Sequence, residues 1–221
     1  MSQEEPPIKR TRLSAKARRS TILAEAGSLF AEAGFDVSTR EIAKRCGITQ
    51  AALYKHFDSK DDIMQAVFRT RYLERDRTEF ALALEAPDLP LEARITNAYT
   101  ALYRRMNREG HRLFFQAAMV GYQLPIEYSE PLDHSVLLPL SRHLRADCGL
   151  HDVETVPWHK DERELMLMLH SVVIFLAIRR NIYNVDMDPR APALIAQDVR
   201  VWLTGARVQV REILQLPAPS A

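Results

Sequence analysis

The chain has 221 residues, 30 Lys and Arg against 29 Asp and Glu, and only seven glycines. A chain of this length buries roughly 70% of its unfolded surface, so it needs no disulfides or metal ions to fold. Its two cysteines, Cys46 and Cys148, lie too far apart for a metal-binding spacing. With no secretory signal sequence, they predict a reducing, cytoplasmic location. Scarce glycine and abundant Ala, Leu, Arg and Glu favour an all-α fold.

The balanced total hides an uneven distribution of charge. Residues 8–60 carry eleven Lys and Arg against five Asp and Glu, whereas residues 61–221 carry nineteen against twenty-two. A basic N-terminal quarter indicates a polyanionic partner for that quarter alone, the alternative being a solvated basic surface. The longest apolar run, Leu165–Ile178, has 14 residues including His170. It is too short to span a bilayer and predicts a buried helix, with no membrane partner.

The first predicted elements are a basic arm and a helix. Residues 1–13 hold two prolines and three basic residues with almost nothing to bury, which predicts a disordered basic arm. A helix is expected from Ser14 to about Ala33, because apolar residues recur there at helical spacing. Gly34 follows as its C-terminal cap.

Three capped helix starts then follow at regular intervals. Ser38, with a glutamate three residues later, has the pattern of a capping box at the start of a short second helix. Gly47 ends that helix, and Thr49 is placed to cap a third helix that runs to about Phe57. Ser59 starts a fourth helix in the same way. Two short helices joined by a tight turn predict a helix-turn-helix, which places its second helix in the major groove of DNA.

Prolines divide the remainder of the chain into longer helices. Pro131 fits the first turn of one of them, and Pro139 is expected to kink or restart that helix. The longest helix is apolar nearly all round, and the last carries two apolar faces. The expected segments are 91–106, a short buried helix at 113–120, 131–148, 161–183, and a last helix after Pro192 to about 216.

The segment Ser38–Ile63, STREIAKRCGITQAALYKHFDSKDDI, carries a dense motif. It has a Ser-x-x-x-Ile-Ala start, a Gly turn and a Leu-Tyr-x-His-Phe-x-x-Lys finish, and it resembles the DNA-binding signature of the TetR family of regulators. Upstream, Ile22–Phe35 resembles the family's first helix, so the match covers about Ser14–Ile63. Cys46 stands where Ala is usual, and a structural cysteine in a packed turn is favoured over a redox switch.

The resemblance implies DNA-contact roles for nine residues. Thr39 and Arg40 are placed to hold phosphates. Thr49 begins the recognition helix, on which Gln50 is suited to pair with adenine and Ala51 to contact a thymine methyl group. For Gln50 the alternative is a solvated surface residue. The remaining implied contacts, to the DNA backbone or to a base, are Tyr54, Lys55, His56 and Lys60.

The resemblance also implies an architecture of about nine helices. A helix-turn-helix DNA-binding domain is expected at 14–60 and a helical bundle for effector binding and dimerisation at 61–216, with disordered segments at 1–13 and 217–221. The last two helices carry more apolar surface than one bundle needs. This surplus predicts a homodimer through them, the alternative being two helices deep inside a monomer.

Members of the family usually bind a small molecule among the middle helices, which changes the separation of the two recognition helices. Here those helices carry Met and aromatic residues without internal charges, which indicates an apolar or amphipathic effector. The alternative is that these residues are simply core. The predicted ligand pocket consists of Leu102, Met106, Phe114, Phe115, Met119, Tyr122, Met166, His170 and Phe175.

No catalytic residues are expected, because the sequence has no Gly-x-Ser-x-Gly, no His-Glu-x-x-His and no i, i+4 pair among its seven histidines. The protein is therefore predicted not to be an enzyme and to need no cofactor or metal. It is interpreted as a cytoplasmic transcriptional regulator, associated with the nucleoid when bound to DNA, that represses from a palindromic double-stranded operator until a small, apolar ligand releases it. An activator, or a nucleoid-associated or scaffold protein of the same fold without ligand control, are the alternatives.

Overall fold

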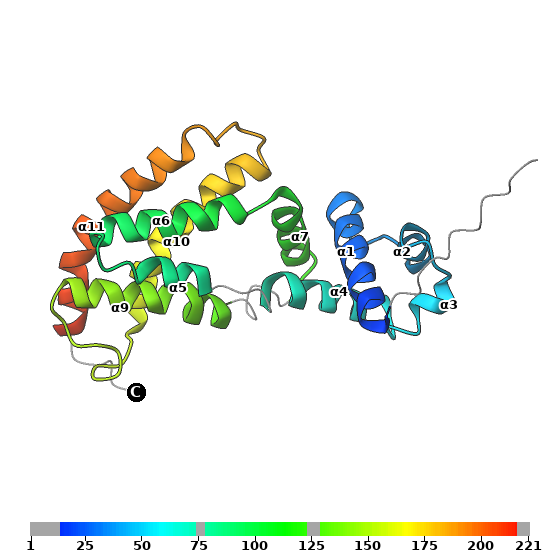
Figure 1. Cartoon of the computed structure of the whole chain (residues 1–221), viewed down its shortest axis with the longest axis horizontal. Coiled ribbons are helices and arrows are strands. Elements are labelled where there is room, and N and C mark those ends of the chain that lie inside the picture. The colour runs from blue at the N-terminus through cyan, green and yellow to red at the C-terminus, as the bar shows by residue number, and fades with distance from the viewer. Residues whose placement is uncertain (1–13, 74–77, 123–128, 216–221) are drawn as a thin grey trace, which may run out of the picture. The chain divides into compact units, whose positions relative to one another are not determined.

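All the elements of the structure, a computed structural model, are helical. Within the described residues there are ten α-helices and two π-helical segments, so the expected all-α fold is confirmed. The chain forms two compact units, Met1–Arg69 and Thr70–Ala221 (Figure 1). The segments expected to be disordered, 1–13 and 217–221, lie outside the described residues. The structure describes residues 14–73, 78–122 and 129–215.

The first unit contains four helices around a small apolar core. α1 packs against α2 and α4, and α2 packs against α3. The core contains Ile22, Ile42, Leu53 and Ile63, one fully buried residue from each helix. Helices as short as α2 and α3 are not stable alone, so this shared core holds them in place. The helices are α1 (Ala15–Ala33), α2 (Thr39–Arg45), α3 (Gln50–Leu53) and α4 (Lys60–Phe68).

Side-chain caps begin all four helices of the first unit. The hydroxyl groups of Ser14, Ser38, Thr49 and Ser59 each accept a hydrogen bond from the backbone N–H three residues on, at 3.0–3.3 Å. The Glu41 carboxylate completes the predicted capping box by accepting from the Ser38 N–H at 2.8 Å. Hydrogen bonds from Ser38 lower the pKa of Glu41 below its usual value. The predicted helix starts are therefore confirmed.

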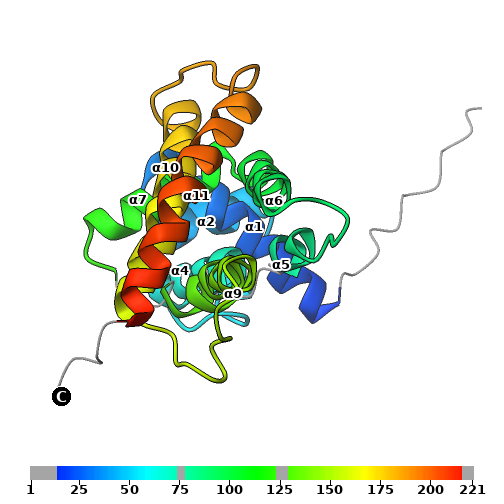
Figure 2. The same ribbon diagram turned by 90° about the vertical axis from the view of Figure 1, so that its left-hand side faces the viewer.

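The second unit is built on three long helices. α6 packs against α5 and α11, and α10 runs beside α11 in both views (Figures 1 and 2). The expected short buried helix at 113–120 is α7, but only Leu113 and Ala117 of it are buried, and Met119 is 86% exposed. The elements are η1 (Arg69–Leu73), α5 (Thr78–Leu84), α6 (Leu91–Arg105), α7 (Arg108–Met119), η2 (Asp133–Leu137), α9 (Leu138–Asp147), α10 (Lys160–Asn181) and α11 (Ala191–Gln215).

Pro139 lies in the first turn of α9, directly after the π-helical segment η2. The Leu138 N–H donates to Asp133 O, a bond to the fifth preceding residue that widens the turn. The new helical segment then starts where a missing proline N–H costs least. The expected restart at Pro139 is therefore confirmed, and its cause is a π-helical turn.

A buried ion pair joins α9 to α10. Arg145 and Glu162 are both fully buried, with Nη2 2.6 Å from Oε2 and Nε 2.8 Å from Oε1. The Arg145 guanidinium also donates to Val156 O at 2.7 Å and to His151 O at 3.2 Å. The pair thus fixes the connection between the two helices, and its charges are compensated where isolated buried charges are costly.

Candidate nucleic-acid interface and cavity

The turn between α2 and α3 is closed by the two hydrogen bonds of a Schellman motif. The Gly47 N–H donates to Lys44 O at 3.1 Å, and the Ile48 N–H donates to Ala43 O at 3.0 Å. Gly47 has φ +63°, a left-handed conformation that glycine adopts without strain. This geometry makes α2 and α3 the helix-turn-helix that the sequence predicts.

The recognition helix is shorter than expected. α3 ends at Leu53, whereas the sequence predicts a helix to about Phe57; the chain continues through a turn in which the His56 N–H donates to Leu53 O at 2.9 Å. Arg19 of α1 contacts this turn. Its Nη1 donates to His56 O at 2.5 Å, and its guanidinium lies 4.0 Å from the centre of the buried Phe57 ring. Arg19 therefore joins α1 to the segment that follows α3.

Six of the nine residues predicted to contact DNA are exposed. Three of the nine are joined by hydrogen bonds: Gln50 Nε2 donates to Thr39 Oγ1 at 2.8 Å, and that hydroxyl lies 3.2 Å from the Tyr54 hydroxyl. This cluster ties the first residue of α2 to α3 and the residue that follows it. The exposed residues are Arg40, Thr49, Gln50, Ala51, Tyr54 and Lys55, and the half-buried ones are Thr39, His56 and Lys60.

Two basic residues of this unit have internal partners that the sequence did not reveal. Lys60 Nζ donates to Phe35 O at 2.7 Å, which joins the start of α4 to the end of the α1 segment. Arg45 lies 3.1 Å from both Glu25 and Glu32, joining α2 to α1. For Arg45, the only sequence signal is opposite charge at separations of 13 and 20 residues. Many charged residues at such separations do not contact each other.

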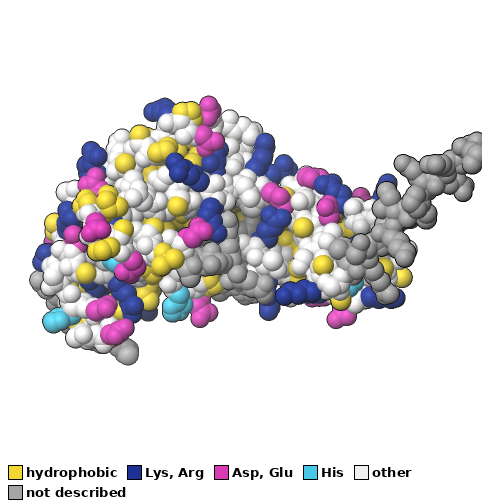
Figure 3. Space-filling model, viewed as in Figure 1, with side chains coloured by type: hydrophobic (Ala, Val, Ile, Leu, Met, Phe, Trp, Pro, Cys, Tyr) yellow, Lys and Arg dark blue, Asp and Glu magenta, His cyan; other side chains and the backbone are white. Residues whose placement is uncertain are grey.

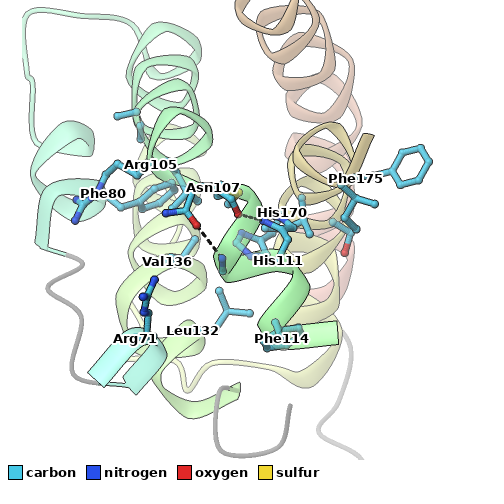
Figure 4. Close-up of a pocket in the computed structure, with 18 of the residues that line it drawn as sticks. Arg71, Phe80, Arg105, Asn107, His111, Phe114, Leu132, Val136, His170 and Phe175 are labelled. Atoms are coloured by element: carbon cyan, nitrogen blue, oxygen red, sulfur yellow. Dashed lines mark hydrogen bonds between the residues drawn. The ribbon is translucent and has the colours of Figure 1, made fainter. Parts of the chain in front are cut away.

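The second unit contains a cavity of about 500 Å³, lined by parts of α6, α7, α10 and neighbouring segments (Figure 4). Three residues predicted for the pocket lie elsewhere: Met166 is fully buried in the core, Met119 is largely exposed, and Tyr122 is off the wall. Phe175 is half exposed at the edge and points away from the cavity. The predicted residues on the wall are Leu102, Met106, Phe114, Phe115, His170 and Phe175.

Charged side chains also line the cavity, contrary to the expectation of none. Arg71 Nη2 lies 2.5 Å from Glu109 Oε1, and Arg105 forms an ion pair with Glu79. Arg71, Glu79 and Arg105 are on the wall, whereas Glu109 is not among the residues that line it. These residues come from helix ends and connections, where sequence periodicity gives no indication of which way a side chain points.

His111 adds a polar but uncharged group to the wall. Its Nδ1 lies 3.0 Å from Asn107 O and 3.3 Å from Asn181 Nδ2. Burial lowers the pKa of this imidazole below its usual value. The ring is therefore neutral at neutral pH and does not contribute a positive charge to the cavity.

Apolar side chains are exposed on the outer faces of α10 and α11. On α10 they are Met168, Val172 and Phe175, at helical spacings of four and three residues. On α11, Val201 is 70% and Val208 55% exposed, and a glycine lies between them. In the view of Figure 3, apolar side chains lie among charged ones over the surface of the second unit. Contiguous exposed apolar surface is typical of protein interfaces.

The fold and the capped turn define an all-helical protein with an N-terminal helix-turn-helix. Residues 22–67 match the family model described as bacterial regulatory proteins, tetR family. The N-terminal helix-turn-helix region thus belongs to the TetR family of transcriptional regulators, whose members named below are regulators and not enzymes. No group of three or more His, Cys, Asp or Glu in the described ranges is arranged to hold a metal ion. Within the same ranges, no helix is long and apolar enough to cross a membrane.

Curated relatives match less than half of the chain. The HTH-type transcriptional repressor KstR2 of Rhodococcus jostii is 37% identical over 90 residues, which is 38% of this chain and 43% of the relative. The HTH-type transcriptional repressor BepR of Brucella suis is 38% identical over 71 residues, or 31% of this chain and 34% of that protein. The chain thus spans less than half the length of these two relatives.

Solved structures match over most of the chain. A TetR-like transcriptional regulator from Rhodococcus sp. RHA1 has a TM-score of 0.63 and 18% identity, covering 88% of this chain and 100% of that one. NalD, the secondary repressor of the MexAB-OprM multidrug efflux pump in Pseudomonas aeruginosa, has a TM-score of 0.54 and 19% identity, covering 87% and 98%. At these identities the likeness is one of fold.

Proposed function

We propose that the protein is a sequence-specific repressor that binds a palindromic operator as a homodimer and is released by a small, largely apolar molecule. The observation that carries the DNA-binding part is the capped helix-turn-helix, with its exposed residues at the start of α3. In such a unit the second helix enters the major groove, and its N-terminal residues face the base edges. The two curated relatives are repressors, which favours repression over activation.

The geometry supports different roles for the nine residues predicted to contact DNA. Gln50 is exposed at the first position of α3, and its amide oxygen and second N–H are free to pair with adenine after the bond to Thr39. Arg40 and Lys55 are exposed cations suited to phosphates. Thr39 and Tyr54 position Gln50 through their shared hydroxyl contact. Lys60 donates one of its three N–H groups to the carbonyl of Phe35, and the other two are suited to a phosphate.

Selection of bound fragments from random DNA tests the sequence-specific part. We expect recovery of a two-fold symmetric motif whose half-site centres are separated by one turn of DNA or a multiple of it, about 10 base pairs. Mapping of bound DNA in cells should then find a few promoters that contain this motif. Binding scattered over the chromosome without a motif would favour the scaffold alternative instead.

The exposed apolar faces of α10 and α11 support the homodimer. Val201 and Val208 lie seven residues apart on one side of α11, and Gly205 between them has no atom within 4 Å of a built Cβ, so another helix can approach closely. We expect Val208→Asp to convert the protein to a monomer in sedimentation velocity and to abolish tight operator binding. Val185→Asp, a matched change at an exposed valine outside both helices, should leave the dimer intact. A dimer that persists in Val208→Asp contradicts this interface.

The cavity supports release by a small molecule. Its volume of about 500 Å³ is within the range of ligand pockets, roughly 300–1,000 Å³, and most of its wall is apolar. Ala101 is on the wall, so Ala101→Phe reduces the available space. In a reporter strain we expect this variant to repress normally but to resist release by inducers. Ala146→Phe, on the exposed side of α9, should respond like the wild type; equal responses of both variants would argue against the cavity.

A further inference from the structure

The charges on the cavity wall are unequally compensated. Arg105 and Glu79 are both on the wall and pair with each other. Arg71 is on the wall too, but its carboxylate partner, Glu109, is not. His111 is neutral, because burial lowers its pKa. Among the described residues, a molecule in the cavity therefore meets one guanidinium whose carboxylate partner is not part of the wall.

Arg71 retains the capacity to bind an anion. A guanidinium has five N–H donors, and within the described residues its contact with Glu109 uses Nη2. The side chain is 28% exposed, so it is neither locked in the core nor fully solvated. Arginine is also the side chain whose geometry best matches a carboxylate, which it can hold through two parallel hydrogen bonds.

Apolar side chains surround this cation. Figure 4 shows Arg71 reaching from η1 toward the part of the wall that Val136 and Leu132 form, with Phe114 at the same end of the cavity. Phe80 and Leu102 continue the apolar wall. A guanidinium at one end of an apolar cavity is suited to a ligand with a charged end and an apolar body, because a charge-assisted hydrogen bond is stronger where water is excluded.

We propose that the effector is an amphipathic anion, an apolar body in the cavity with a terminal carboxylate that pairs with Arg71 and displaces Glu109. This inference rests on the proposed role of the cavity as the effector site, and it adds the chemical class of the ligand. It also gives the two members of the ion pair opposite roles. Arg71 binds the ligand, whereas Glu109 competes with it.

The test compares three probes of the same chain length, decanoate, 1-decanol and decylammonium, by titration calorimetry on the full-length dimer at neutral pH. A hydrogen bond to a charged group contributes about 1.5–3 kcal/mol, so we expect decanoate to bind about 10- to 100-fold more tightly than decanol. Decylammonium should bind most weakly. Ala101→Phe should weaken decanoate and decanol alike, which places both in the cavity.

Two substitutions separate binding from a structural role of the ion pair. Arg71→Gln should weaken decanoate by about tenfold or more and leave decanol unchanged. Glu109→Gln should strengthen decanoate, because it removes the competing carboxylate. Arg142→Gln, an exposed arginine of α9, should change neither. If the pair only supports the fold, both Arg71→Gln and Glu109→Gln weaken all probes, and that result overturns the proposal.

The remaining outcomes distinguish this inference from the proposed function. Decanol that binds as tightly as decanoate overturns the anion class while the cavity remains a ligand site. Failure of all three probes to bind overturns both. Decanoate that binds through Arg71 without changing operator affinity supports the anion site and contradicts the release mechanism.

Discussion

The two units of the protein differ in how many of their helices begin with a local side-chain cap, although both also contain long-range polar contacts. In the first unit, four helix starts are capped by a hydroxyl group that bonds to the backbone three residues away. In the second unit, Arg145 and Glu162 are 17 residues apart, Trp202 Nε1 donates to Leu165 O across 37 residues, and Arg180 donates to Tyr103 O across 77. The proposed DNA surface is thus set mainly by local signals, and the cavity by contacts between distant elements.

This difference teaches where each unit is vulnerable. Loss of one cap removes about 1 kcal/mol and leaves the rest of a small local structure in place. Loss of a buried long-range contact leaves a charge without its partner in the interior. Both tryptophans, Trp158 and Trp202, are in the second unit, so intrinsic fluorescence reports on that unit, and amide hydrogen exchange in α2 reports on the first.

The largest effect is expected from Arg145→Met. It leaves Glu162 buried without a cation, which should lower the free energy of unfolding by about 3–5 kcal/mol. Urea unfolding followed by tryptophan fluorescence measures this loss. Arg142→Met, which breaks only exposed ion pairs of the same helix, should cost about 0–1 kcal/mol. Equal losses would contradict the claim that burial makes the difference.

Two glycines allow a matched comparison of the units. Gly47 and Gly149 have φ of +63° and +67°, and a Cβ added at either position would have no other atom within 4 Å. A change to Ala should therefore cost about 1–2 kcal/mol at either position through backbone conformation alone. We expect Gly47→Ala to speed hydrogen exchange in α2 and weaken DNA binding. Gly149→Ala should lower the free energy of unfolding measured by tryptophan fluorescence and leave DNA binding intact. An equal loss of DNA affinity in both variants would contradict the proposed difference between the units.

A smaller effect is expected from Ser38→Ala. It removes the hydroxyl that accepts from the Glu41 N–H and keeps the bond from the Ser38 backbone N–H to the Glu41 carboxylate, which should cost about 1 kcal/mol and speed hydrogen exchange at the start of α2. Ser20→Ala, at an exposed position inside α1, removes a hydroxyl without a cap and serves as the control. Slower or unchanged exchange in α2 of Ser38→Ala would show that tertiary packing, and not the cap, holds the helix.

The same difference in range explains what the sequence predicts. The helix caps at Ser38 and Thr49 and the turn at Gly47 each involve residues a few positions apart. The helix-turn-helix is therefore predictable from the local sequence. The contact between Arg19 and the turn after α3 is not, because Arg19 is 37 residues from the carbonyl that it binds. The family motif implies a DNA contact for Lys60. The structure adds a hydrogen bond from Lys60 to the Phe35 carbonyl, which the sequence does not indicate.

In the second unit the helices themselves are predictable, and their surroundings are not. Apolar periodicity locates α6, α10 and α11, but it does not indicate whether a methionine faces core, cavity or solvent. Met106 lines the cavity, Met166 is in the core and Met119 is exposed. Arg71 enters the wall from η1, which has no amphipathic pattern to reveal it.

The smallest effect is a pH dependence from His111. Its pKa is lowered in the folded protein, so above pH 6.5 the ring is neutral in both states and contributes no pH dependence. As the pH falls through 6.5, the unfolded chain takes up the proton first and the folded state loses stability until the folded pKa is passed. His111→Gln should remove this acid-side loss in urea unfolding between about pH 8 and pH 5. An unchanged pH profile would contradict it.

The most direct test of DNA reading uses the selected operator and a scrambled fragment at one fixed salt concentration, with affinity measured by fluorescence anisotropy. Gln50→Ala should cost about 1–3 kcal/mol on the operator and almost nothing on the scrambled fragment, whereas Lys60→Ala should weaken both alike. Gln65→Ala, an exposed glutamine of α4 paired with Asp61, is the matched control and should change neither. Equal losses of Gln50→Ala on operator and scrambled DNA would contradict base reading by the helix-turn-helix.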